Sequence, residues 1–579
     1  MEQPLVEMSG ARASSTETPR AKLDEEVTRL GDHARTWAGL DATQRADLLE
    51  SCAPRLQAVA RRWVEAAARA KGLTMDEPAV SEEWLGGPMT TMRNLRLLVR
   101  SLREISAHGK PQVPAPWFGQ TPEGCTDVRV FPVESYEGVL QAGFSGRIRF
   151  EPGMSLAQVR ERQASAYGKK GAEGGVSLIL GAGNVASIPP MDAFYKLFVE
   201  GRVALIKMNP VNEYLGPFYE EALEPLVRRG YLSVVYGGAE AGGHLVEHPA
   251  VADVHITGSI HAHDFIVWGA TAEERERRKA AGDPKLKKPI TSELGCVTPL
   301  VLVPGRFSPQ ELRFIAENIA TMKANNGGFN CNAATMLVTS KAWPQREAFF
   351  TELKAVLSGV RPRLSYYPGA RDRHARAVDG RDQVELLGPK DDQRIPWTLL
   401  RGLSPAAEDP LYVHESFCPV LGEVALEEAD PAAFLAAATR FCNEKLWGTL
   451  SMMVMIHPDT ERDPQVSKAL SAAVNALKYG AVAINQWAGL AYGMVTTPWG
   501  GHPSATLADA QGGLGWVHNT FMFEGIEKCV VRGPLTVSPR PPWFVTHKNA
   551  HRVAERLFEL ECAPSWLKVP GIALAALKG

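Results

Sequence analysis

Hydrophobic and polar positions follow two different periods along this chain. From about residue 23 to residue 106, apolar side chains recur at helical spacing, most clearly in the Ala-, Arg- and Leu-rich stretch 45–70. Between residues 175 and 236, short apolar runs at 176–180 and 203–206 are separated by loops and helical stretches. Such runs are typical of parallel strands covered on both faces, so their order predicts a nucleotide-binding α/β layer.

A second α/β region follows, from residue 291 to about 495. It contains an apolar strand pattern at 299–303 and helical patterns at 344–358 and 431–440. Two ribbon-like segments with strand patterns, near 128–150 and 526–537, lie outside both regions. The two regions therefore predict two α/β units along the chain.

The ends of the chain have patterns of their own. Residues 1–22 are rich in Ser, Thr, Glu and Pro and predict a disordered leader. Near the other end, 549–561 predicts an amphipathic helix, and the apolar tail 569–577 is too short to span a membrane. We therefore expect a packed C-terminal extension over residues 546–579. The charge-dense stretch 270–288 is interpreted as a solvated helix, with a lid or docking element as the alternative.

Composition narrows the function. With 579 residues, 45% hydrophobic and 22% charged, the chain is of ordinary globular type and long enough for several domains. A net charge of −2 gives no electrostatic case for nucleic acid or an anionic membrane as partner. The eight cysteines are sparse and form no CxxC motif, which is typical of a reducing compartment. These features predict a cytoplasmic protein that does not bind a membrane.

Cys331 is the residue most indicative of chemistry. It lies among turn-forming residues between a predicted helix at 311–323 and a predicted strand at 335–338, where reactive groups tend to be displayed. Glu293 precedes it by 38 residues. A thiol nucleophile and a carboxylate base together can form a thioester and then hydrolyse it.

At these residues the chain resembles the aldehyde dehydrogenase superfamily. Eight short blocks occur in that family's order over about 320 residues: Gly183-Asn184, Lys207-Met208-Asn209-Pro210, Ile256-Thr257-Gly258-Ser259, Glu293-Leu294-Gly295, Cys331, Glu415-Ser416-Phe417-Cys418-Pro419-Val420, Ile484-Asn485 and Pro498-Trp499-Gly500-Gly501. The resemblance covers about residues 25–535. Each short motif alone would be weak evidence for the resemblance, but eight motifs in the family's order are strong evidence.

The resemblance implies a fold and an assembly. The fold is α/β, with a nucleotide-binding α/β domain, a catalytic α/β domain and a small β oligomerisation extension. The implied boundaries are, in chain order, 23–290 for the cofactor-binding domain with its ribbon at 125–155, 291–495 for the catalytic domain, and 496–545 for the return to the cofactor domain. On this analogy a homodimer or homotetramer is expected.

The resemblance also implies roles for the residues. Cys331 would attack an aldehyde, the Cys331 backbone N–H and the Asn184 side chain would stabilise the oxyanion, and Glu293 would activate the deacylating water. The implied cofactor-binding residues are Lys207, Gly258, Ser259, Glu415 and Phe417. The cofactor would be NAD or NADP: Pro210 stands where a carboxylate often favours NAD, and NAD is preferred only slightly.

Several positions depart from the family pattern. Cys418 and Cys296 replace common glycines, and Phe329 stands where glutamine is usual, which leaves the shape of the substrate site open. Together with Trp487 and Trp499, Phe329 indicates either an aromatic-lined tunnel or core packing.

Two sequence patterns resemble binding sites but do not predict them. The loop Gly181-Ala182-Gly183-Asn184-Val185-Ala186 fits a loose dinucleotide fingerprint, but Ile188-Pro189-Pro190 is expected to separate it from the next helix. The metal alternative rests on His255, His261, His263 and Asp264, whose spacing does not converge, so no metal site is predicted.

Two other functions stay open. The first is a CoA-linked reductase or acylating dehydrogenase, since Gly183-Asn184-Val185 resembles a motif of fatty acyl-CoA reductases. Glu293 argues against it, because those relatives usually lack the deacylating carboxylate. The second is a non-catalytic scaffold that retains the fold.

Overall fold

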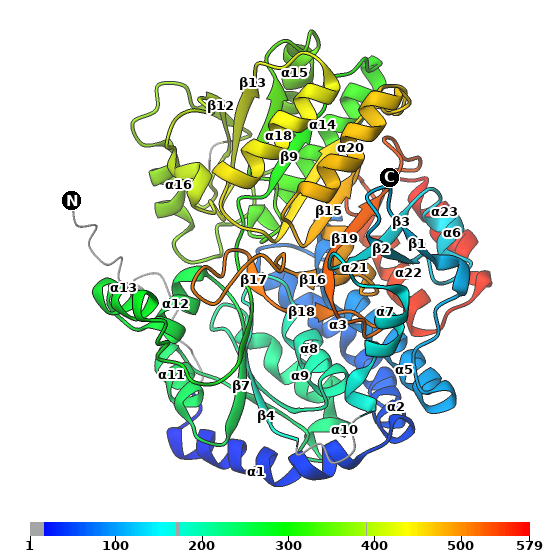
Figure 1. Ribbon diagram of the computed structural model, residues 1–579, viewed down its shortest axis with the longest axis vertical. Helices are drawn as coiled ribbons and strands as arrows, with labels where there is room; N and C mark the ends of the chain where they lie inside the picture. Colours follow the sequence, from blue (N-terminus) through cyan, green and yellow to red (C-terminus); the bar gives the residue numbers. More distant parts are fainter. Residues whose placement is uncertain (1–16, 169–173, 390) are drawn as a thin grey trace.

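Two large sheets organise the chain into two lobes, one above the other in Figure 1. The structure is a computed structural model and describes residues 17–168, 174–389 and 391–579. The lower lobe in that view contains a six-stranded sheet, and the upper lobe contains most of an eleven-stranded sheet. Each sheet lies within its own hydrophobic core.

The six-stranded sheet has the parallel arrangement expected from the apolar runs. Its order is β17-β8-β7-β4-β5-β6, and all neighbours are parallel except β17. Four of its strands are almost entirely buried, because helices cover both faces. The strand bounds are β4 Val176–Leu180, β5 Val203–Lys207, β6 Leu232–Val235, β7 Val251–Thr257, β8 Ile290–Glu293 and β17 Gly513–Leu514.

The eleven-stranded sheet joins the second α/β region to the ribbon. Its order begins with β1 (Phe118–Gln120), β2 (Thr126–Phe131), β3 (Ser145–Phe150) and β19 (Ile526–Arg532). The order continues with β15 (Ala481–Ile484), β14 (Ser451–Met455), β9 (Pro299–Leu302), β10 (Met336–Ser340), β13 (Val420–Leu426), β12 (Trp397–Leu403) and β11 (Glu385–Leu387). β3 pairs antiparallel with β19, and β19 pairs parallel with β15, so the predicted ribbon continues the larger sheet within one chain. A separate pair is formed by β16 (Pro498–Gly500) and β18 (Trp516–His518).

Helices surround the two sheets. Those of the lower lobe are α1 (Arg20–Gly39), α2 (Ala42–Glu50), α3 (Ala53–Ala70), α4 (Ser81–Trp84), α5 (Thr90–His108), α8 (Ile188–Phe194), α9 (Gly216–Ala222), α10 (Glu224–Val227), α11 (Ala239–Glu247) and α12 (Ile260–Trp268). Those of the upper lobe are α14 (Pro309–Ala324), α15 (Arg346–Gly359), α16 (Ala370–Val378), α17 (Pro410–Val413), α18 (Pro431–Lys445), α19 (Pro458–Glu461), α20 (Pro464–Ala476) and α21 (Gly489–Met494). Short helices α6 (Glu137–Leu140) and α7 (Leu156–Arg162) flank the ribbon.

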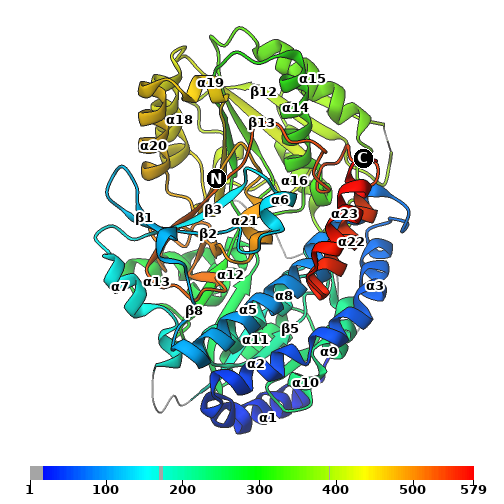
Figure 2. The same cartoon turned by 90° about the vertical axis from the view of Figure 1, so that its right-hand side faces the viewer.

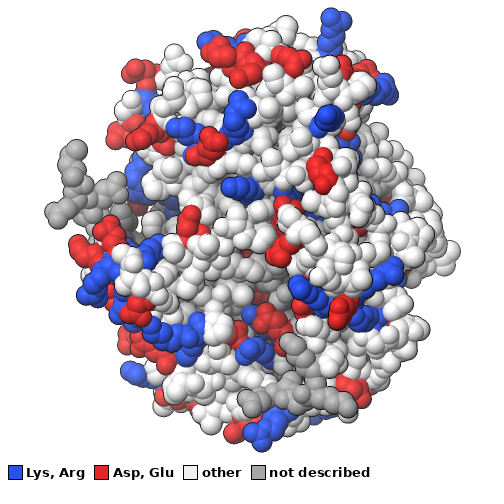
Figure 3. All heavy atoms as spheres, in the orientation of Figure 1, with Lys and Arg blue, Asp and Glu red and all other residues white. Residues whose placement is uncertain are grey.

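The charge-dense insertion forms a helix on the surface. α13 (Ala272–Ala281) has no buried residue, begins with the Thr271 cap and ends at Gly282 in the left-handed region. On the face shown in Figure 3, acidic and basic side chains are intermingled, without a large patch of one sign. Among the residues that the structure describes, no helix combines the length and apolar character needed to cross a membrane.

The two ends of the chain differ from each other. The predicted disordered leader lies mostly outside the described residues, but its boundary was placed too late, because α1 already begins at Arg20. At the other end, α22 (Ala550–Cys562) and α23 (Val569–Ala576) form a packed hairpin. α22 packs against α3, α4 and α5, and Figure 2 shows both C-terminal helices on the same side of the molecule as α3.

Candidate active site

Cys331 follows a tight turn at the end of α14. Ser308 begins that helix with a reciprocal capping box, and the 3₁₀ turn Asn325–Gly328 follows its last residue. Gly328 has a φ of 81°, and a Cβ there would lie 3.0 Å from the Cys418 carbonyl oxygen. This turn therefore requires glycine, and it presents the partly buried Cys331 just before the central strand β10.

Asn184 lies beside the cysteine loop. Its Nδ2 donates a 2.9 Å hydrogen bond to the carbonyl oxygen of Phe329, two residues before the nucleophile. The backbone carbonyl of Asn184 accepts hydrogen bonds from Asn326 Nδ2 at 3.0 Å and from Lys71 Nζ at 3.2 Å. The loop after β4 is thus fixed to the loop of Cys331, as the resemblance implied.

Asn184 and Cys331 line one cavity, whose volume is about 1470 Å³ including the space at its mouth. Trp487 also lines this cavity, and its indole N–H donates to the Asn332 carbonyl at 2.9 Å. Phe329 packs instead against Tyr366, Tyr367 and Phe417, and Trp499 is buried in the core. Of Phe329, Trp487 and Trp499, only Trp487 therefore lines the cavity that contains Cys331.

Glu293 ends β8 and is 3% exposed. Among the described residues, neither of its carboxylate oxygens has a partner at good hydrogen-bond geometry, although the Trp499 indole lies near enough to oppose the rise in its pKa. Ligand atoms of Asp192, His255 and Glu293 all lie within 4.8 Å of one another. Burial, and then the neighbouring Asp192 carboxyl, raise the pKa of Glu293 well above that of an ordinary carboxyl. Once ionised, a carboxylate with a raised pKa is a stronger proton acceptor than an ordinary one.

The pKa of the Cys331 thiol lies well above its ordinary value. Burial is the largest cause, and the nearby Glu293 and Glu415 carboxylates raise the pKa of Cys331 further. The thiolate, and not the neutral thiol, is the nucleophile. The thiol must therefore lose its proton against this environment, so a nearby base or the bound ligands have to assist.

Glu415 lies directly over the Glu293-Leu294-Gly295 segment. A Cβ on Gly295 would be 2.1 Å from Glu415 Oε2, so only glycine leaves room for this carboxyl. Burial raises the pKa of Glu415 to about 8, and its Oε1 has no partner among the described residues. Phe417, with a φ of 38°, contacts Tyr367 at 4.9 Å between ring centroids. Two motifs far apart in sequence thus meet at one point.

Lys207 ends β5, as predicted, and is 8% exposed. Burial lowers the pKa of Lys207 to about 8, against the opposing effect of Glu213. Glu213 was missed from the sequence because it is six residues beyond the lysine, in a separate 3₁₀ turn. It supplies a carboxylate near the strand end even though Pro210 occupies the usual position.

Gly258 and Ser259 lie between β7 and α12. Ser259 caps α12 by accepting a hydrogen bond from the Ala262 N–H at 3.2 Å. The Gly258 N–H already donates to the Glu293 carbonyl at 3.0 Å, which ties β7 to the strand that carries the proposed base. Of these two residues expected to bind the cofactor, Gly258 therefore has its N–H engaged within the protein.

The structure corrects one prediction and adds two residues to the surroundings of Glu293. The prolines after the glycine-rich loop do not separate it from a helix, because α8 begins at Ile188 with both prolines in its first turn. His255 lies beside Asp192 and Glu293, a grouping that its sequence neighbours did not indicate. Asp192 was missed entirely, since its approach to β7 and β8 depends on tertiary structure.

Several of the solved structures that resemble this chain are aldehyde dehydrogenases. The glyceraldehyde-3-phosphate dehydrogenase GapN from Methanocaldococcus jannaschii, complexed with NADP, matches with a TM-score of 0.57 and 14% identity over 90% of this chain and 96% of that one. Aldehyde dehydrogenase 21 from Physcomitrella patens, in complex with succinate, has a TM-score of 0.59 and 14% identity, covering 89% of this chain and 90% of its own. KauB from Pseudomonas aeruginosa has a TM-score of 0.59 and 16% identity, with 90% of each chain covered.

These likenesses show that the chain has the aldehyde dehydrogenase fold. The predicted α/β fold class is thereby confirmed. A scan of protein-family models gave no match, and neither did a comparison with curated protein sequences. The fold is therefore recognisable in three dimensions at identities too low for sequence comparison.

Proposed function

We propose that the protein is a member of the aldehyde dehydrogenase superfamily that oxidises an aldehyde to a carboxylic acid with NAD or NADP. The observation that carries the proposal is the position of Asn184 at the loop of Cys331, in one shared cavity. A thiol, an amide donor and a buried carboxyl near one another are the groups that covalent aldehyde oxidation requires. The aldehyde dehydrogenase neighbours support the same chemistry.

The chain's own residues supply the covalent steps. Cys331 would give its proton to water that carries it to solvent, and its sulfur would attack the carbonyl carbon to form a thiohemiacetal. The free N–H of the Asn184 amide would donate to the developing oxyanion, together with the Cys331 backbone N–H. Loss of hydride leaves a thioester on Cys331. Glu293 would then remove a proton from water, the hydroxide would attack the thioester, and the acid would leave as the thiolate is restored.

The residues at the strand ends fit a nicotinamide dinucleotide, which would accept the hydride when bound. Lys207 offers a cation at the carboxyl end of β5, where ribose or phosphate oxygens are bound in such sheets. Glu415 offers a buried oxygen without a partner, suited to a ribose hydroxyl. Ser259 lies at the N-terminal end of α12, where backbone N–H groups could bind a pyrophosphate. GapN, a neighbour in fold, is complexed with NADP, so a preference for NAD has no support here.

The deciding experiment measures reduction of NAD and, separately, of NADP with hexanal and benzaldehyde, with and without CoA. Turnover without CoA that is lost in Cys331→Ala, and a burst followed by slow turnover in Glu293→Gln, would support the proposal. Turnover that requires CoA and is indifferent to Glu293→Gln would favour the acylating alternative instead. Absence of dinucleotide binding would revive the scaffold hypothesis.

A further inference from the structure

The cavity that contains Cys331 extends to the C-terminal helix α22, which lies outside the region of family resemblance. Leu557 and Leu560 of α22 line it. The remaining apolar lining comes from several distant segments, among them Leu140, Phe144, Leu490 and Trp543. A wall of leucine and aromatic side chains favours an apolar ligand, because burial of each methylene is worth about 0.8 kcal/mol.

The charged side chains that line the cavity are paired with one another or with neighbours. Lys71 Nζ lies 2.8 Å from Glu83 Oε1, and the carboxylate of Glu82 lies 2.6 Å from Arg363 Nη2. The other three lining charges, Arg93, Glu137 and Glu561, form one ion-pair cluster. A substrate with a carboxylate or phosphate would therefore meet no uncompensated cation along this wall.

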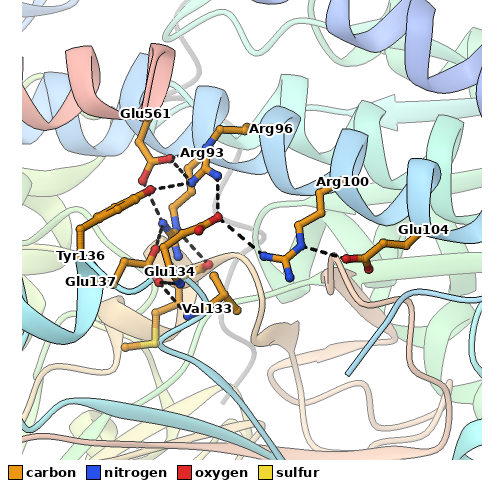
Figure 4. Close-up of polar contacts among 10 residues, drawn as sticks. Arg93, Arg96, Arg100, Glu104, Val133, Glu134, Tyr136, Glu137 and Glu561 are labelled. Atoms are coloured by element: carbon orange, nitrogen blue, oxygen red, sulfur yellow. Dashed lines mark hydrogen bonds and ion pairs between the residues drawn. The ribbon is translucent and has the colours of Figure 1, made fainter. Parts of the chain in front are cut away.

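The ion-pair cluster also fixes the wall in place. Glu561 accepts from Arg93 Nη1 at 2.8 Å and from Arg96 Nη2 at 2.7 Å, which connects α22 to α5. Figure 4 shows these side chains converging with Glu137 and Glu134 of the segment between β2 and β3. Glu137 accepts from the backbone N–H groups of Val133 and Glu134 at 2.8 and 3.0 Å. α22 is thus a built part of the cavity and not a loosely attached tail.

One donor in this cluster is left over. Arg93 is 5% exposed, and its Nη2 has no partner in the described part of the chain. Arg93 already faces the Glu137 and Glu561 carboxylates, so its unused Nη2 does not add an uncompensated positive charge to the wall.

We propose that the substrate is an uncharged aldehyde with an extended apolar chain, and that Leu557 and Leu560 of α22 select it. The inference rests on the proposed function and gives its substrate class. The aldehyde group would lie at Cys331 and Asn184, while the chain would lie along the leucine and aromatic wall. The C-terminal extension is then a specificity element.

The test compares kcat/KM for propanal, hexanal and decanal with that for 4-oxobutanoate, a small charged aldehyde. We expect kcat/KM to rise by up to about fourfold per added methylene, as hydrophobic transfer allows, and to be lowest for 4-oxobutanoate. In Leu560→Trp the ratio of kcat/KM for decanal over propanal should fall at least about tenfold, since the indole would fill the chain's path. Leu560 is 2% exposed and also packs in the core against α23, so this variant is read only where its Tm stays close to that of the wild type. Leu557→Trp, at a partly buried position of the same wall, is the second variant and should show the same fall. The matched control is Leu574→Trp, on the exposed face of α23, where the side chain is 62% exposed and the ratio should stay within about twofold.

A preference for 4-oxobutanoate, or an unchanged ratio in Leu560→Trp, would overturn the inference. Binding of 1-decanol and 1-propanol, measured by calorimetry, separates this result from failure of the proposed function. If no aldehyde is oxidised but 1-decanol binds at least about tenfold more tightly than 1-propanol, and Leu560→Trp removes the difference, the apolar site stands while the oxidation proposal fails. If 1-decanol shows no such preference, the site itself is refuted.

Discussion

The Nδ2 of Asn184 donates a 2.9 Å hydrogen bond to the carbonyl oxygen of Phe329, two residues before Cys331. A side-chain amide has two N–H donors, and this bond uses one of them. The first N–H holds the loop of the nucleophile, which leaves the second for a developing oxyanion. One side chain can therefore position the thiol loop and stabilise the reaction.

We expect Asn184→Ala to lower kcat by about 10²–10³-fold, the usual effect of losing an oxyanion donor. Steady-state kinetics with a fixed aldehyde would measure it. Iodoacetamide labelling of Cys331 serves as the control, because it shows whether the thiol loop is still formed. An unchanged kcat with full labelling would remove Asn184 from the oxyanion role.

Asp192 should shift the pH at which Glu293 acts. Its carboxyl raises the pKa of Glu293, so the acidic limb of kcat should lie at higher pH than an ordinary carboxyl would give. Burial raises the pKa of Asp192 as well, so the two carboxyls titrate as a pair. Asp192→Asn removes one acid from that pair and should move the limb to lower pH. The pH profile of kcat under deacylation-limited conditions measures this, with Asp264→Asn, on α12, as the matched control. A limb that stays in place would show that Asp192 does not act on the base.

The raised pKa of Glu293 also predicts a pH-dependent stability. Its folded pKa lies above the unfolded value, so its contribution to stability is present at low pH and is lost as pH rises through the folded pKa. Glu293→Gln stays neutral at every pH. The variant should therefore match the wild type in Tm near pH 4.5 and exceed it by a few degrees near pH 8.5. Equal Tm values at both pH values would mean that Glu293 ionises without cost.

Gly295 should not tolerate a methyl group. A Cβ at this position would lie 2.1 Å from Glu415 Oε2 and 2.6 Å from its Cδ, so the carboxyl must move. We expect Gly295→Ala to destabilise the protein by about 1–3 kcal/mol. Addition of Glu415→Ala should restore much of the loss, because the two residues are in contact. Gly359→Ala, where nothing lies within 4 Å, is the control in thermal unfolding. Equal Tm values for Gly295→Ala and this control would contradict the prediction.

The sequence predicted those parts of the fold whose signals are local. Val176–Leu180 is a short apolar run, a pattern typical of strands in buried parallel sheets, and in the structure it forms β4. The hairpin of α22 and α23 was likewise expected as a packed extension. The hydrogen bond from Arg93 to Glu561 joins residues 468 positions apart, so no local pattern of hydrophobic and polar residues could predict it.

The same limit applies to the site. Cys331 and Glu293 were recognisable because their immediate neighbours form motifs, and the nearness of Asn184 to the cysteine loop followed only from the resemblance. Asp192 has no such motif; its side chain reaches His255 and Glu293 from α8, a helix that packs against β4 and β5. Glu213 was overlooked because the carboxylate was sought three residues after Lys207 and not six.

The depressed pKa of Lys207 makes a prediction about the cofactor. With a pKa of about 8, its ammonium group loses its charge as pH rises through that value, and with it the attraction for phosphate oxygens. The affinity for NADP should therefore weaken between pH 7 and pH 9, and more steeply than the affinity for NAD, which lacks the 2′-phosphate. Lys207→Arg should remove this pH dependence, since arginine stays charged.

Glu213→Gln should improve the affinity for NADP relative to NAD by removing a nearby negative charge. Calorimetric Kd values for both dinucleotides at each pH are the measurement, with Glu220→Gln on α9 as the control. A pH dependence that persists in Lys207→Arg would assign the titrating group elsewhere.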